Sequence, residues 1–200
     1  MHIADLEKEL ALATEHVEKT LASRESITKR TAAFDRLAKA QRALAAAKGD
    51  EYAAPFDIGF VPEAAVSEPT FFETERVSLL AFSAVRQMPD WRREDADYGL
   101  VEIVHCFTSA FGTWDEELRR HPLSSKGLCG YGVYEIVNSG WKKVLCERGG
   151  LYFPGTPGPT QRHFVFTFHD STFQCIASDL RGVTIPRPFE NVLSEVKKRW

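Results

Sequence analysis

Four neighbouring residues, His169 to Thr172, contain the side-chain types of a hydrolytic triad: a base, an acid and a hydroxyl nucleophile. In such a triad the histidine takes the proton of the nucleophile, and the carboxylate orients the histidine. The three side chains must converge, whereas neighbours along an extended strand point to opposite faces. Asp, Ser and Thr are also the residues with which tight turns bond their own backbone. The pattern therefore favours a turn and keeps His169 and Asp170 as candidates for a site.

A second group of polar residues comes earlier in the chain and consists of His121, Glu135 and Asn138. Within a helix, a spacing of three would put Glu135 and Asn138 on one face. His121 stands before a proline in an expected loop, where it could act as a base or a ligand. Hydrogen bonds that cap the helix and tie the loop to it explain the same residues, and this interpretation is favoured. If the groups instead converge in a pocket, they form the site of a hydrolytic or transfer enzyme, with five candidate residues: His121, Glu135, Asn138, His169 and Asp170.

No metal site and no cofactor site are predicted. His163 and His169 share a face of one expected strand, but six residues of strand separate them by roughly 20 Å, too far for one ion. His105 could approach one of them across strands, which leaves the ligand set thin. The segment 149–159 is rich in glycine but contains three prolines. Because proline lacks the N–H group that a phosphate-binding loop presents, we expect a connecting loop there.

Charge and hydropathy disfavour nucleic acid and membranes as partners. The net charge of the 200 residues is −3, and the bases between residues 29 and 42 spread around their expected helix. No apolar run approaches the roughly 18 residues that span a bilayer. Four cysteines without a CxxC pair are typical of free thiols in a reducing compartment. We therefore expect a cytoplasmic protein.

The first 48 residues predict a helical arm. Residues 3–48 contain no Gly and no Pro, and Gly49 supplies a helix stop. Two arm shapes fit: one continuous, coiled-coil-like helix, or two antiparallel helices that turn at residues 23–26. The acidic first half and basic second half suit the hairpin, whereas the lack of Gly, Asn or Pro at the turn slightly favours the continuous helix. Either shape leaves an apolar heptad seam that needs a partner, formed by Ile3, Leu6, Leu10, Ala13 and Val17.

Residues 49–70 read as a proline-rich linker, and residues 71–200 as one α+β domain. The domain is expected to contain an antiparallel sheet with helices packed on one face. Residues 70–85 favour a strand over a helix, whereas residues 88–98 are polar and turn-like. Alternation in the phenylalanine-rich stretch predicts a half-buried strand that a hairpin turn joins to the next strand. The elements expected after the linker are strands at 70–85, 100–111, 163–169 and 173–177, and helices at 131–147 and 189–200.

Two blocks of sequence resemble an uncharacterised bacterial protein family. The first block is Arg120-His-Pro-Leu-Ser-Ser-Lys-Gly-Leu128, continued by Tyr131-Gly-Val-Tyr-Glu-Ile-Val-Asn-Ser139 and Trp141. The second is Phe166-Thr-Phe-His-Asp-Ser-Thr-Phe-Gln-Cys-Ile-Ala177. The resemblance implies that residues 100–180 form one domain. It implies no catalytic role, because no activity is known for that family.

These observations favour a non-catalytic interaction or regulatory protein. On this hypothesis the arm, residues 3–48, forms a homo-oligomer or binds a protein partner, because its seam cannot stay in water. The enzyme with the five candidate residues is the alternative. Nucleic-acid binding is a second alternative, which the acidic net charge disfavours.

Overall fold

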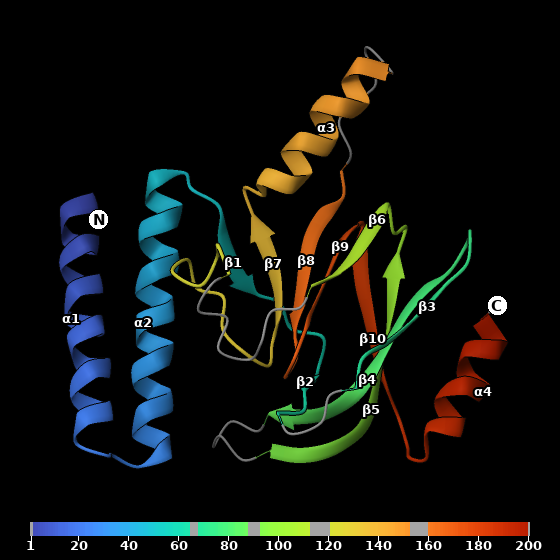
Figure 1. Cartoon of the computed structure of the whole chain (residues 1–200), viewed down its shortest axis with the longest axis horizontal. Coiled ribbons are helices and arrows are strands. Elements are labelled where there is room, and N and C mark those ends of the chain that lie inside the picture. The colour runs from blue at the N-terminus through green and yellow to red at the C-terminus, as the bar shows by residue number, and fades with distance from the viewer. Residues whose placement is uncertain (1, 65–67, 88–92, 113–120, 153–159, 200) are drawn as a thin grey trace.

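The N-terminal arm is a hairpin of two antiparallel helices. The computed structural model describes residues 2–64, 68–87, 93–112, 121–152 and 160–199. Helices α1 (Ile3–Ala22) and α2 (Ile27–Lys48) stand side by side at one side of the sheets (Figure 1). The slightly favoured continuous helix is therefore wrong. Arg24 supplies the turn with a left-handed φ of 49°, and the Ser26 hydroxyl caps α2 by accepting from the backbone N–H of Lys29.

Packing within the hairpin covers the middle of the heptad seam, while Ile3 stays exposed and Leu10 is half-buried. Leu6, Ala13 and Val17 of α1 are buried, and the small side chains of Ala33 and Ala40 let α2 approach closely. The opposite charges of the two halves also meet in two ion pairs, Glu9–Arg36 and Glu7–Lys48, both at 2.9 Å. Exposed ion pairs contribute at most about 1 kcal/mol each, so apolar burial is the main reason for the hairpin.

A second face of α2 docks on the rest of the chain. Ala38 and Ala45 are buried there, and Nη1 of Arg42 donates to the carbonyl of Gly127 at 3.2 Å. Gly127 has a φ of +87°, and a Cβ at this position would lie 2.3 Å from Cγ of Arg42. Only glycine fits this contact without strain. The arm is thus held against the domain.

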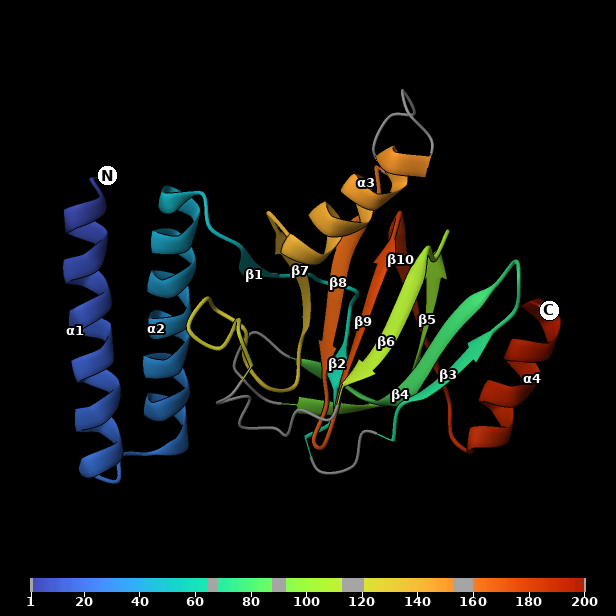
Figure 2. The same ribbon diagram turned by 45° about the horizontal axis from the view of Figure 1, so that its top comes forward.

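The strands form two antiparallel sheets that face each other (Figures 1 and 2). Sheet A has the order β1-β7-β8-β9-β6, and sheet B has the order β10-β5-β4-β2 with β3 also paired to β4. Helix α4 (Phe189–Arg199) covers the outer face of sheet B through Val192 and Val196. The expected α+β fold with antiparallel strands and a helical arm is confirmed. The strand bounds are β1 Tyr52–Pro55, β2 Val61–Pro62, β3 Thr70–Glu73, β4 Ser78–Gln87, β5 Arg93–Val104, β6 Thr108–Gly112, β7 Val133–Val137, β8 Arg162–Thr167, β9 Thr172–Ala177 and β10 Asp179–Ile185.

Residues 49–70 are not a linker without regular structure, because β1 and β2 lie within them. Two of their three prolines, Pro55 and Pro62, sit in edge strands, where a missing N–H costs no ladder bond. The strand expected over 100–111 breaks at His105, which has a φ of 48° and lies exposed at the turn between β5 and β6. The turn-like stretch 88–98 contains the start of β5, while 88–92 lie outside the described residues.

The helix expected over 131–147 is wrong in its first half. Residues 133–137 form β7, and α3 (Gly140–Tyr152) begins only after Ser139. The run Val-Tyr-Glu-Ile-Val has high strand propensity, and β1 and β8 pair with it on its two sides. Helix α3 also takes in residues 149–152 of the expected glycine-proline loop, because a glycine inside a helix costs only about 1 kcal/mol. Residues 153–159 of that loop lie outside the described part of the chain.

Phenylalanines fill the space between the sheets. Phe164, Phe166 and Phe168 are buried together, and Phe82 of sheet B packs against the last two at 6.0 and 5.4 Å between ring centroids. The expectation that this strand is half-buried is wrong, because the alternate residues His163, Val165 and Thr167 are buried as well. Residues 123–129 and helix α3 pack over this outer face of sheet A.

Candidate functional site

A chain of three polar side chains runs through the outer face of sheet A. The Ser139 hydroxyl lies 2.8 Å from Nδ1 of His163, and Nε2 of His163 lies 3.2 Å from Oε1 of Gln174. With the proton on Nε2, the imidazole donates to Gln174 and accepts from Ser139. This is the order of nucleophile, base and orienting group that activates a serine. None of the three is among the five candidate residues expected from the sequence, which weighs His163 only as a metal ligand.

The turn between β7 and α3 places Ser139 at the start of the helix. Asn138 has a left-handed φ of 56°, and its side-chain amide donates to the carbonyls of Gly49 and Asp50 at 3.4 and 3.2 Å. The Ser139 hydroxyl accepts from the backbone N–H of Lys142 at 3.1 Å, which is the bond of a helix N-cap. Ser139 therefore ties the first turn of α3 to His163 of β8.

His163 is a neutral, buried histidine. Burial lowers the pKa of His163 to about 4, and Trp141 packs edge-on against the imidazole at 5.2 Å between centroids. His121 lies close enough for its positive charge to lower the pKa of His163 further. Burial also lowers the pKa of His121, whose Nδ1 accepts from the backbone N–H of Leu123 at 3.1 Å. The sequence candidate His121 thus belongs to this cluster.

Access decides what the cluster can do. Ser139 and His163 are only 6% and 4% exposed, so a substrate cannot reach the hydroxyl in this structure. The hydroxyl also accepts a helix N–H, which occupies one of its lone pairs. A surface concavity lies elsewhere, between α1, α2 and the loop that contains Ser125 and Lys126, and no candidate residue lines it. The geometry is that of a satisfied polar network that fastens α3 to sheet A.

Glu135 does not share a helix face with Asn138, because it lies in the middle of β7. Its carboxylate forms a two-pronged ion pair with Arg162 of β8, in which Nε donates to Oε1 at 3.0 Å and Nη2 donates to Oε2. Arg162 also lies 3.6 Å from Asp179 and 4.7 Å above the ring of Phe56. Glu135 is therefore part of a cross-strand ion pair that joins β7 to β8.

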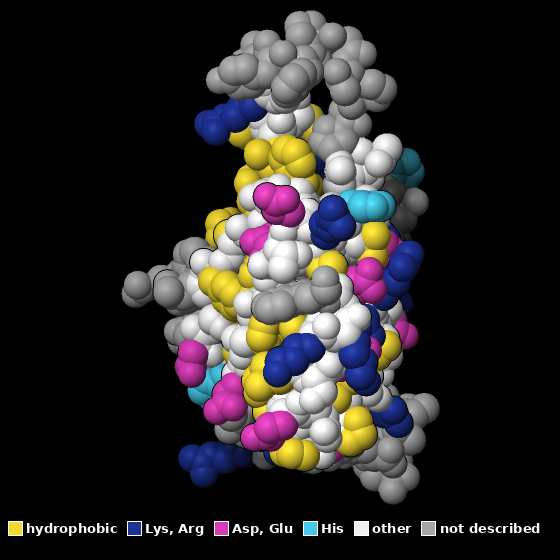
Figure 3. Space-filling model, turned by 90° about the vertical axis from the view of Figure 1, so that its right-hand side faces the viewer, with side chains coloured by type: hydrophobic (Ala, Val, Ile, Leu, Met, Phe, Trp, Pro, Cys, Tyr) yellow, Lys and Arg dark blue, Asp and Glu magenta, His cyan; other side chains and the backbone are white. Residues whose placement is uncertain are grey.

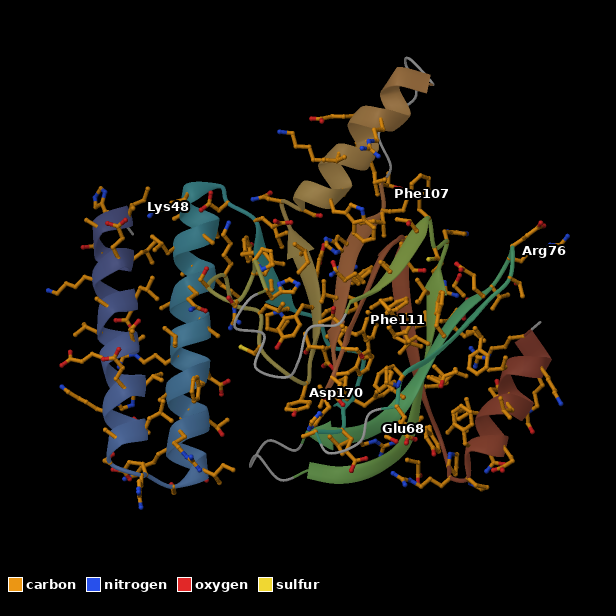
Figure 4. The ribbon with its side chains drawn as sticks, viewed as in Figure 1. Lys48, Glu68, Arg76, Phe107, Phe111 and Asp170 are labelled. Carbon is orange, nitrogen blue, oxygen red and sulfur yellow. The ribbon has the colours of Figure 1, made fainter. Side chains whose placement is uncertain are left out.

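His169 and Asp170 occupy the turn between β8 and β9, as the favoured interpretation of that segment predicts. Nδ1 of His169 lies 2.9 Å from Oδ1 of Asp170, and the N–H of Phe168 donates to the carbonyl of Ser171 at 2.8 Å. Asp170 points outward at the tip of this hairpin (Figure 4). Within the described residues, no three potential metal ligands gather at one point.

Among the described residues of the domain, the most exposed aromatic side chains lie at β6, an edge strand of sheet A. Phe107, directly before β6, is 59% exposed, and Phe111 within it is 50% exposed. Figure 4 shows Phe107 and Phe111 at separate points at and beside this strand. Hydrophobic side chains also reach the surface on the face of the molecule that Figure 3 shows. Phe111 packs against the buried Phe173 of β9, with 5.0 Å between the ring centroids. We call Phe107, Phe111 and strand β6 the β6 edge.

The described helices include none that combines the length and the apolar character needed to cross a bilayer. Comparison of the chain with protein-family models, curated proteins and solved structures yields no match.

Proposed function

We propose that this chain is a non-catalytic interaction protein that binds a protein partner through apolar surface. The observation that carries the proposal is the β6 edge, where two phenylalanines remain at least half exposed. Leaving large apolar side chains in water forgoes roughly 25 cal/mol per Å² that burial would contribute. Exposed aromatic residues at such a position are typical of binding surfaces.

The contacts of the polar candidate residues support the same proposal. Asn138 fixes a turn, Glu135 forms an ion pair, and His169 with Asp170 builds a hairpin tip. His121 and its neighbour His163 are buried. Each of these contacts satisfies a backbone or side-chain group of the fold, as buried polar groups in proteins generally require.

The arm offers a second apolar surface. Because Leu6, Ala13 and Val17 of the heptad seam are buried within the hairpin, the seam no longer supports self-association of residues 3–48. Helix α2 nevertheless exposes Ile27 and Phe34 at 73% and 45%. These side chains support contact of the arm with a protein partner, or with a second copy, as part of the same interaction function.

The test compares what three forms of the full chain capture from the cytosol of the source cells. The first is the wild type, and the second carries Phe107→Ser with Phe111→Ser. The matched control carries Val144→Ser with Leu193→Ser, which are 45% and 39% exposed on α3 and α4. We expect proteins that bind the wild type and the control but not the β6 variant. Identical captured sets for all three forms would contradict the proposal, provided that thermal melts show each form folded.

A further inference from the structure

We propose that the β6 edge binds an extended, uncharged peptide segment of a partner protein by strand addition, an inference that rests on the proposed interaction function. Strand β6 pairs antiparallel with β9 along one side, from Thr108 opposite Ile176 to Gly112 opposite Thr172. Among the described strands, none pairs with its other side. An edge strand of this kind presents backbone donors and acceptors to a further strand.

The composition of β6 sets it apart from the other edges of the two sheets. Sheet edges are commonly protected from pairing by charged residues or proline. The sequence Thr-Ser-Ala-Phe-Gly of β6 contains neither. Each of the other edge strands described here carries such a residue: Pro55 in β1, Pro62 in β2, Glu73 in β3, and Asp179 with Arg181 in β10.

The side chains beside this edge define what an added strand would meet. In the register with β9, Phe111 lies opposite Phe173 and Ser109 lies opposite Cys175, so all four share the face toward sheet B. Phe71 of β3, in sheet B, also packs against Phe173, with 4.9 Å between the ring centroids. Alternate residues of an added strand would therefore lie beside Phe111, next to an aromatic cluster that both sheets contribute.

The area of the patch decides between a second copy and a peptide. A fully buried aromatic side chain removes about 150–250 Å² from water. The exposed halves of Phe107 and Phe111 therefore offer roughly 200 Å² per chain, or about 400 Å² when two copies meet. Stable interfaces bury about 1,200–2,000 Å². The patch is too small for a dimer that rests on it alone. It suits a strand of about five residues, which gains affinity from main-chain hydrogen bonds and specificity from alternate side chains.

The experiment uses the full chain, labelled with ¹⁵N, and a capped peptide Thr-Phe-Gln-Ser-Ile-Ala. This is the sequence of β9 with Ser in place of Cys175, chosen because β6 already accepts that sequence as a neighbour. Two analogues carry N-methyl groups on the first, third and fifth or on the second, fourth and sixth residues. In an antiparallel strand, alternate N–H groups point toward the same neighbouring strand. Only one of the two methylation patterns therefore removes the peptide N–H groups that donate to β6.

We expect the plain peptide and one analogue to bind and to slow the hydrogen exchange of amides in β6. The other analogue should bind at least about tenfold more weakly. Phe107→Ser should weaken the plain peptide by a similar factor. Equal binding of all three peptides, or binding by none, would overturn strand addition. The protein alone could instead form a dimer that Phe107→Ser abolishes. That result would show that the β6 edge binds a second copy and would overturn the proposal of a peptide segment. The proposed function fails separately, when the β6 variant captures the same proteins as the wild type.

Discussion

Acidification should destabilise the protein through His163, and the size of this effect follows from its burial. Burial lowers the pKa of His163 to about 4 in the folded chain, while a histidine in the unfolded chain titrates near 6.5. The unfolded state then binds the proton more tightly. Stability is therefore complete above about pH 6.5 and falls as the pH drops toward 4.

The magnitude comes from the difference of the two pKa values. One unit corresponds to about 1.4 kcal/mol, so the full loss is about 3 kcal/mol and about 2 kcal/mol of it appears between pH 7 and pH 5. The fall of the His121 pKa on burial acts in the same direction. The contribution of His163 has to be isolated with a variant. His163→Gln removes the titrating group and keeps an amide near the Ser139 hydroxyl.

Urea unfolding at pH 7, 6 and 5 gives the free energy of unfolding of each form by linear extrapolation. We expect the advantage of the wild type over His163→Gln to shrink by about 2 kcal/mol from pH 7 to pH 5. His16→Gln, which replaces an exposed histidine of α1, is the matched control for the substitution itself. Parallel curves for the wild type and His163→Gln would refute the reasoning, as would an NMR titration that places the His163 pKa near 6.5.

Three further predictions concern packing and thiols. Gly127→Ala should cost about 2 kcal/mol more than Gly49→Ala, measured by urea unfolding: both positions have positive φ, but only at Gly127 does the new Cβ meet Arg42. An equal cost would show that the arm is not docked there. Phe166→Ala should cost about 3–5 kcal/mol, and a loss under about 1 kcal/mol would contradict its place between the sheets. Thiol titration of the non-reduced, denatured chain should find all four cysteines free. In the native chain Cys175 should react last, because it is buried and burial raises its thiol pKa; a fast reaction of Cys175 would contradict that position.

Local sequence patterns predicted the elements whose determinants are local. The turn at Asp170 and Ser171 follows from turn chemistry between two apolar runs, and α4 follows from its spacing and its C-terminal bases. The hairpin in the arm was underestimated for a physical reason. The opposite charges of the two halves suit a hairpin, but its turn uses Arg24 in a left-handed conformation. The Gly or Asn that usually marks such a turn is absent, so the turn residues themselves do not indicate it.

Elements that depend on distant partners were not predictable in the same way. Five residues from Val133 to Val137 are too few to separate helical from strand periodicity, and the strands that pair with them begin at Tyr52 and Arg162. The His163 network has the same origin. Ser139 and Gln174 lie 24 and 11 residues away from His163, and no spacing rule connects a helix cap to two neighbouring strands.

The contrast between polar and apolar candidates explains why residue types alone pointed toward chemistry. The ends of helices and strands leave backbone groups that need partners, so Asn, Ser, His and Asp gather at turns and caps whether or not a site is there. Asn138, Ser139 and Asp170 all stand at such ends, and hydrogen bonds within the fold account for them. No comparable need places Phe107 and Phe111 in water, because a phenylalanine contributes to stability only where it is buried. Among the described residues, the exposed aromatic pair is therefore a feature that folding alone does not explain, and a partner strand would account for it.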